Sequence, residues 1–144
     1  MTAASSKKKP SGFKFSANSK KNMAGVNPIL VTLAEQTLQR SPFDFGVISN
    51  GGFRTAEMQH ELFLKGRSKL DGYIQISHHQ LGNAIDLVPY IDGKFTWSNK
   101  KAFEGIHKVA MQVWAEMNVK GVQLTWGGHW SFYDPAHYQI KTKR

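Results

Sequence analysis

The chain has 144 residues, of which 40% are hydrophobic, and it carries 19 lysines and arginines against 10 aspartates and glutamates. This length suits one domain with one core, and the lack of cysteine excludes both disulfides and thiolate metal sites. The net charge of +9 favours a polyanionic partner such as nucleic acid, anionic lipid or an acidic wall polymer.

Composition divides the chain into a tail and a domain. Residues 1–12 are rich in lysine and serine and are predicted to form a basic flexible tail, followed by one domain over residues 13–144. The early lysines are not followed by the apolar run of about 7–15 residues that a signal peptide requires, and no stretch reaches the roughly 18 apolar residues of a membrane span. We therefore expect a protein that is made in the cytoplasm and is not inserted into a membrane.

The first half of the chain shows the pattern of a helix, a short strand and a second helix. Asn27-Pro28 is a helix cap followed by proline at the first helical position, and apolar residues then recur at helical spacing until Ser41-Pro42. The apolar run 45–49 predicts a short buried strand. Thr55 can cap the next helix, which is expected to end near Gly66.

The second half mixes strands with the longest predicted helix. Alternation over residues 84–90 predicts a strand, and Asp92-Gly93 is a two-residue hairpin signal. Ser98 can cap a long helix with a continuous apolar stripe, and Gly121 follows its end. Further strands are predicted at residues 94–97, 122–126 and 137–140. Because hairpins replace regular βαβ units, we predict an α+β fold: a single domain with a small antiparallel sheet and packed helices.

Histidines and acids gather in two segments, SHHQLGNAID over residues 77–86 and GGHWSFYDPAH over residues 127–137. A catalytic zinc ion typically has three protein ligands and a water whose pKa falls to about 7 on the metal. A nearby carboxylate then accepts the proton of that water. Two histidines, one ligating acid and one free acid would supply this set, although the spacing leaves His78 and His79 equivalent. His60 and His107 lie in predicted helices and are expected to be structural.

Arg54 is a candidate of a second kind. It lies in GGFRT, between the predicted buried strand and the next helix, where its guanidinium could bind a substrate carboxylate through two hydrogen bonds. The alternative is an ordinary solvated arginine. Other chemistries fit less well, because the chain has no cysteine nucleophile, no GxxxxGK phosphate loop and no GxSxG serine elbow.

Three segments together resemble a known family. SHHQLGNAID matches the SxHxxGxAxD signature of the zinc D-alanyl-D-alanine carboxypeptidases and their relatives, which share the hedgehog/DD-peptidase fold. WGGHW followed by DPAH is similar to a second signature of that family, and GFRT followed by Gln59 is similar to a third. Within the family, FKFSANS, VNPIL and GNAIDLVPYIDGKFTW most resemble the L-alanyl-D-glutamate peptidases that tailed bacteriophages use as endolysins.

The resemblance implies one zinc ion per chain and a division of labour around it. The implied roles are metal ligands, His79, Asp86 and His137; a catalytic base, Asp134; a catalytic and substrate-binding arginine, Arg54; and two further substrate-binding residues, Ser77 and Gln59. The chain departs from the family pattern at two positions. His78 is an additional histidine beside the ligand, and His129 stands where relatives often have aspartate. A rival ligand set of His79, His129 and His137 therefore stays open.

The resemblance also implies a function. We expect a zinc metallopeptidase that cleaves the peptidoglycan stem peptide as an L-alanyl-D-glutamate endopeptidase and acts as a phage endolysin. It would be a monomer that accumulates in the host cytoplasm and reaches the periplasm and cell wall through a holin pore. One alternative is a D,D-carboxypeptidase that releases terminal D-alanine. A more remote alternative is a basic nucleic-acid-binding protein, but the lysines concentrate in the two tails and no recognition signature is present, so we expect no nucleic-acid partner.

Overall fold

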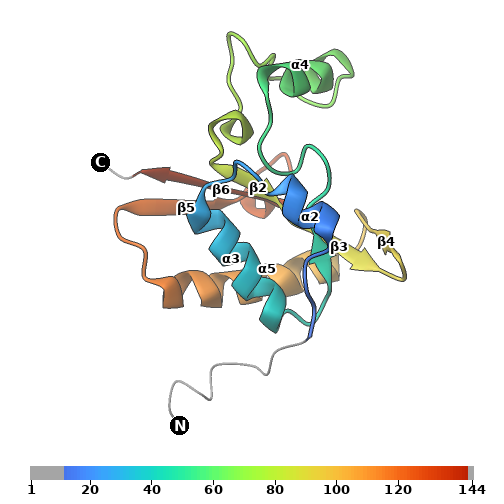
Figure 1. Cartoon of the computed structure of the whole chain (residues 1–144), viewed down its shortest axis with the longest axis vertical. Coiled ribbons are helices and arrows are strands. Elements are labelled where there is room, and N and C mark those ends of the chain that lie inside the picture. The colour runs from blue at the N-terminus through green and yellow to red at the C-terminus, as the bar shows by residue number, and fades with distance from the viewer. Residues whose placement is uncertain (1–11, 143–144) are drawn as a thin grey trace.

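Helices and short antiparallel strands are mixed along residues 12–142, the part of the chain that the computed structural model describes (Figure 1). The predicted basic tail, apart from its last residue, lies outside the described residues. The helices are α2 (Ala17–Asn22), α3 (Pro28–Arg40), α4 (Ala56–Leu64), α5 (Lys100–Met117) and the short 3₁₀ helices η1 (His78–Leu81) and η2 (Gly127–His129). The strands are β1 (Phe45–Gly46), β2 (Ala84–Asp86), β3 (Val88–Ile91), β4 (Lys94–Phe95), β5 (Val122–Trp126) and β6 (His137–Thr142).

Helix starts follow the predicted caps in two cases. The Asn27 side chain accepts a hydrogen bond from the backbone N–H of Ile29 at 2.9 Å and so begins α3. The hydroxyl of Thr55 likewise accepts from the N–H of Met58 at 3.1 Å and begins α4. Both predicted helices are therefore confirmed.

The ends of α5 differ from the prediction. Asn99, and not Ser98, is the N-cap, because its side chain accepts the N–H of Ala102 at 3.0 Å. The helix stops at Asn118, which adopts the left-handed conformation with φ of 51°, three residues before the predicted Gly121. Asparagine adopts this conformation more readily than most residues, which explains why the helix can end at Asn118 without a glycine.

Two three-stranded antiparallel sheets replace the single sheet that was predicted. Their strand orders are β1-β3-β4 and β2-β6-β5. The predicted strand 84–90 is divided between them at Leu87, whose N–H donates to the carbonyl of Ala136 at 2.9 Å. As a result Asp86 ends β2 directly opposite His137, the first residue of β6.

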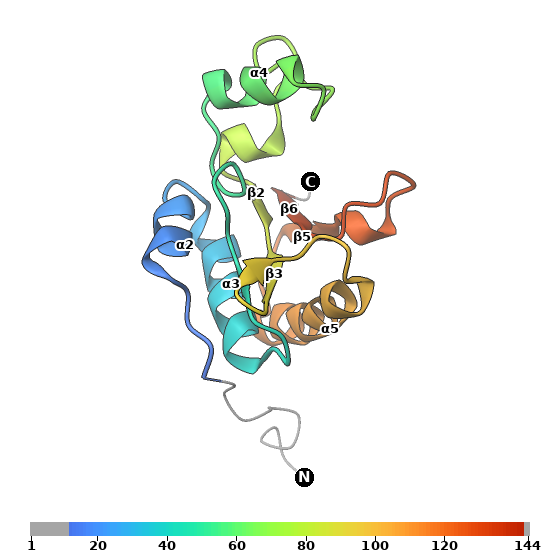
Figure 2. The same cartoon turned by 90° about the vertical axis from the view of Figure 1, so that its right-hand side faces the viewer.

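The hydrophobic core lies between the strands and two crossing helices, α3 and α5 (Figures 1 and 2). The predicted apolar stripes face inward, and each fully buried large side chain contributes about 1.5–3 kcal/mol to folding. The largest buried contributors from the two helices are Leu30, Leu33, Leu38, Phe103 and Ile106. This core gives β2 and β6 a rigid support, and these strands carry two of the predicted site residues.

Helix α4 and the turns that follow it project from the core, on the far side of the strands from α3 and α5 (Figures 1 and 2). This projecting segment exposes apolar side chains, including Leu64 and Ile74. Of the helices in the described part of the chain, none combines the length and apolarity that a membrane span needs.

Candidate active site

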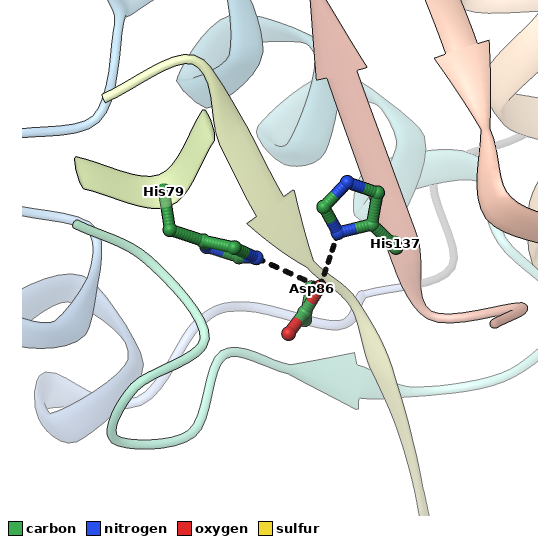
Figure 3. Close-up of side chains that lie close together, drawn as sticks. All are labelled: His79, Asp86 and His137. Carbon is green, nitrogen blue, oxygen red and sulfur yellow. Dashed lines mark hydrogen bonds and ion pairs between the residues drawn. The ribbon is translucent and has the colours of Figure 1, made fainter. Parts of the chain in front are cut away.

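Three of the predicted site residues converge from three separate elements (Figure 3). His79 lies in η1, Asp86 ends β2 and His137 begins β6. Nε2 of His79 lies 3.4 Å from Oδ1 of Asp86, and Nδ1 of His137 lies 3.2 Å from the same oxygen. Among residues 12–142, these three form the group whose potential ligand atoms all lie within 4.8 Å of one another. The structure therefore places His79, and not His78, beside Asp86.

A single 3₁₀ turn explains the spacing of this histidine. The Ser77 hydroxyl accepts the N–H of His79 at 3.1 Å and caps the start of the turn. Gly82 ends it in the left-handed conformation with φ of 73°, where a side chain would be strained and would also meet the carbonyl of Gly25. The N–H of Asn83 then bonds back to the carbonyl of His78 and directs the chain into β2.

Hydrogen bonds on the far side of each imidazole fix its orientation. Nδ1 of His79 donates to the carbonyl of Gly52 at 2.8 Å, and Nε2 of His137 contacts Oε1 of Gln139 at 2.8 Å. With these partners in place, Nε2 of His79 and Nδ1 of His137 face the carboxylate. Metal-binding histidines are commonly oriented in this way, by a hydrogen bond from the ring nitrogen that does not bind the metal. Burial opposes ionisation of both His137 and Asp86, but their mutual contact prevails: it raises the pKa of His137 and, together with His79, holds the pKa of Asp86 below its usual range.

Asp134 lies in the turn that precedes β6. Its N–H donates to the carbonyl of Gly127 at 3.0 Å, and its own carbonyl accepts the N–H of His137 at 3.2 Å. A Cβ added at Gly127 would overlap that carbonyl oxygen, which explains the glycine. Burial and the negative charge of Asp86 raise the pKa of Asp134 against the opposing charges of His137, His79 and Arg54. A carboxyl with a raised pKa is a stronger proton acceptor once it is ionised.

Arg54 brings a cation to the other oxygen of Asp86. Its Nη2 lies 3.6 Å from Oδ2 of Asp86, and its Nε donates to the carbonyl of Asn50 at 2.6 Å. The backbone N–H of Arg54 also donates to the carbonyl of His79 at 3.1 Å, so the two predicted site segments are joined. Burial lowers the pKa of Arg54, while the charges of Asp86 and Asp134 act in the opposite direction, and a guanidinium keeps its proton at any ordinary pH.

Two predicted substrate-binding residues, Gln59 and Ser77, are buried and support other residues of the site. Gln59 is 0% exposed: its Oε1 accepts from Nη1 of Arg54 at 3.0 Å, and its Nε2 donates to Ser68 and Leu70. Ser77 is buried and its hydroxyl caps η1. In these contacts Gln59 orients Arg54, and Ser77 orients His79, while direct contact of either side chain with substrate stays a prediction.

Replacing Gln59 with leucine should destabilise the protein and weaken its activity. The partly buried partners of the amide, Ser68 and the Leu70 carbonyl, would lose their hydrogen bonds, at a cost of about 0.5–1.5 kcal/mol per bond. Denaturant unfolding measures the loss, and Gln112→Leu, at an exposed position of α5, is the matched control. Equal free energies of unfolding for Gln59→Leu and wild type would contradict the supporting role.

The other histidines lie outside the converging group. The ring of His129 is exposed and lies 5.0 Å from the Trp126 ring and 5.7 Å from the His107 ring, so the rival ligand set is not brought together. His107 stacks on Trp126 with ring centroids 3.6 Å apart, and Nδ1 of His60 contacts the carbonyl of Asp71 at 2.9 Å. His78 is half-buried, and burial together with nearby positive groups lowers its pKa.

The burial of His107 predicts a loss of stability in acid. Burial and the neighbouring charge of His129 lower the pKa of His107 from 6.5 to about 4. Between these values the unfolded chain binds a proton that the folded chain does not, so stability falls as the pH falls through this window. His107→Phe should keep the ring contact with Trp126, and its Tm should drop less than that of wild type from about pH 7 to about pH 5. Equal drops in thermal unfolding would contradict this assignment.

Several contributors were missing from the predicted site. Gln139 orients His137, the carbonyl of Gly52 orients His79, and the ring of Trp130 lies 5.1 Å from the ring of His137. The sequence held a signal for Gln139, because residues i and i+2 of a strand share a face, and for Trp130, which lies in the WGGHW segment. The carbonyl of Gly52 carries no such signal, since any residue has a carbonyl.

Fold and site together define a class of protein. Two imidazoles and a carboxylate can hold a metal ion. The same site contains Asp134, a half-buried carboxyl with a raised pKa, and Arg54, a partly buried arginine beside Asp86. This arrangement is that of a candidate metal-dependent hydrolase, in which the metal activates water and a carboxylate moves its proton.

Comparisons with known proteins name the family. The model of the phage L-alanyl-D-glutamate peptidase family matches residues 11–144. The chain is 36% identical to the L-alanyl-D-glutamate peptidase of Escherichia phage T5 over 129 residues, 90% of each protein. Its structure is similar to the crystal structure of the L-Ala D-Glu endopeptidase ChiX of Serratia marcescens, with a TM-score of 0.73 and 27% identity over 90% of this chain and 92% of that one.

The chain belongs to the phage L-alanyl-D-glutamate peptidase family. This membership confirms the predicted family, the α+β fold and the predicted class of enzyme, a peptidoglycan peptidase.

Proposed function

We propose that the site holds one zinc ion on His79, Asp86 and His137. Two imidazole nitrogens and one carboxylate oxygen form a ligand mixture that suits catalytic zinc, which keeps a further position open. The orientation of the rings supports this proposal. Each imidazole turns a ring nitrogen toward the Asp86 carboxylate, and electron-rich atoms that converge in this way repel one another unless a proton or a cation lies between them.

The residues around this group supply the remaining chemistry. When bound, the ion would polarise the peptide carbonyl and lower the pKa of water. Asp134 takes the proton of the attacking water and delivers it to the leaving amine as the C–N bond breaks. Its raised pKa makes it a better proton acceptor than an exposed aspartate. Arg54, held beside Asp86, offers hydrogen-bond donors and positive charge to the substrate.

The bond that we propose is the one between L-alanine and D-glutamate in the peptidoglycan stem peptide. The convergence of His79, Asp86 and His137 beside Asp134 carries the catalytic part of the proposal. The choice of bond rests on the relatives, because the phage T5 and Serratia marcescens proteins are both named for it. The rival is a D,D-carboxypeptidase, which would use the same chemistry to release terminal D-alanine.

Digestion of purified sacculi tests the bond and the metal in one experiment. Mass spectrometry should find new L-alanine carboxyl ends and D-glutamate amino ends. A chelator should abolish the reaction, and added zinc should restore it. Released free D-alanine would overturn the choice of bond, while full activity in chelator, with no metal bound to the protein, would overturn the proposed zinc site.

We further propose that the protein acts as an endolysin: it accumulates in the host cytoplasm and reaches the wall through a holin pore. The phage family and the net charge of +9 support this, because a basic protein is attracted to an anionic wall, less strongly at high salt. Bacteria that express the chain together with a holin should lyse, and bacteria that express the chain alone should not. Lysis at the same rate without the holin would contradict the release route.

A further inference from the structure

An exposed group of aromatic residues adjoins the site and takes no part in the chemistry proposed above. Trp130, Phe132 and Tyr133, here called the aromatic platform, lie within four successive residues of the segment between η2 and β6. All three are exposed, and Phe132 most of all, at 78%. Figure 2 shows this orange-red segment projecting from the body of the molecule. Exposed large apolar side chains that gather in one place commonly mark a binding surface.

The platform begins at the site itself. The Trp130 ring lies 5.1 Å from the ring of His137, and Tyr133 directly precedes Asp134 in the chain. Nζ of Lys100, at the start of α5, lies 5.9 Å from the centre of the Tyr133 ring. This cation–π contact ties the platform to the body of the protein and helps to hold Tyr133. The platform therefore adjoins the site, through Trp130 beside His137 and Tyr133 next to Asp134.

The chemistry of peptidoglycan places a sugar close to the proposed bond. The amine of L-alanine in the stem peptide is linked to the lactyl group of N-acetylmuramic acid. One residue and one lactyl unit thus separate the L-alanyl-D-glutamate bond from the sugar, which is about 7 Å of extended chain. The faces of a sugar ring carry C–H groups that pack on aromatic rings, while its hydroxyl rim stays in water.

We propose that the aromatic platform binds the N-acetylmuramic acid residue that carries the stem peptide. This inference rests on the proposed function, because only cleavage next to L-alanine brings the sugar this close to the site. It goes further by assigning a role to Phe132 and Tyr133 and by predicting that the enzyme distinguishes a glycan-linked peptide from a free one. Because the platform adjoins the site where the stem peptide would be cut, the sugar attached to that peptide is the expected occupant, and a lipid surface is not.

Two soluble substrates test the proposal on the full chain. One is the stem peptide with N-acetylmuramic acid on its L-alanine. The other carries a lactyl group alone, so that both lack the positive amine and differ only in the sugar. Wild type should cut the muramyl peptide with a kcat/KM about three- to tenfold higher, the size of one or two aromatic contacts. Phe132→Ala and Tyr133→Ala should reduce the ratio of the two kcat/KM values toward unity.

The matched control is Ile74→Ala, at an 89% exposed apolar side chain in the segment that projects after α4. This variant should keep the full advantage of the muramyl peptide. Equal kcat/KM values for the two substrates in wild type, or a proportional loss on both in Phe132→Ala, would overturn the platform while the proposed function stands. If wild type cut neither substrate, the proposed function would fail and the platform with it. If Phe132→Ala lost binding to anionic phospholipid vesicles yet kept the sugar preference, the surface would serve a membrane and the proposal would be overturned.

Discussion

Asp134→Asn should abolish most peptide hydrolysis while the protein retains its metal. The amide keeps the size of the side chain but accepts no proton, and removal of a general base typically slows an enzyme about 10²- to 10⁴-fold. The carboxylate group of Asp134 is absent from the converging group of His79, Asp86 and His137, so the metal should remain near one equivalent per chain. Initial rates on sacculi and elemental analysis of the purified variant measure the two quantities.

Asp92→Asn is the matched control for this substitution. Asp92 lies in the exposed turn between β3 and β4 with φ of 54°, a conformation that asparagine tolerates. Both rate and metal content should stay at the wild-type level there. If Asp134→Asn lost its metal, Asp134 would be a ligand and the assignment of a base would be wrong. If it kept its rate, proton transfer would have to pass through another group.

His79→Ala should lose both metal and activity. The side chain is buried, its Nδ1 is held by Gly52 and its Nε2 faces Asp86, so water cannot take its place with the same geometry. Because a bound metal stabilises the folded state by mass action, the variant should also lose the stabilisation that added zinc gives. That stabilisation is about 2.7 kcal/mol when free metal is about 100 times its Kd. Thermal unfolding with and without zinc measures this difference for each chain.

His129→Ala distinguishes the two ligand sets that the sequence left open. The ring of His129 lies against Trp126 and His107, away from Asp86, so this variant should bind zinc as wild type does. A loss of metal in His129→Ala together with metal retained in Asp86→Asn would favour the rival set of His79, His129 and His137. If both His129→Ala and Asp86→Asn kept their metal, the metal site would have to lie elsewhere in the chain.

Much of the fold could be predicted because its signals are local. The caps at Asn27 and Thr55 each satisfy a backbone N–H two or three residues away, so a short window of sequence contains the whole interaction. The inward stripes of α3 and α5 follow from helical spacing alone. The ends of α5 were missed by one residue at the start and three at the end. Ser98 and Asn99 are both capping residues, and Asn118 and Gly121 both adopt positive φ, so the sequence offers two candidates at each end.

The division of residues 84–90 between two sheets could not be read from alternation. Both halves alternate as one strand would, and the break at Leu87 depends on a hydrogen bond to the carbonyl of Ala136, which comes from the other end of the chain. A sequence pattern records which faces are apolar, but it does not record which partner strand is available. This break is also what leaves Asp86 at the end of a strand, opposite His137.

The sequence by itself determined the chemistry that this protein can use. Without cysteine, a metal must be held by histidines and carboxylates, and the resemblance of SHHQLGNAID to the SxHxxGxAxD signature implied His79 as the ligand. Tertiary structure decided which groups meet. His137 and Asp86 stand 51 residues apart in the chain and touch only because β2 and β6 pair. The sequence does not show whether Gln59 contacts substrate or Arg54, and only the folded structure shows that it is buried and bonded to the arginine. The sequence supplies the residue types and their spacing, from which local structure follows. Long-range packing decides which of these side chains meet and which are buried.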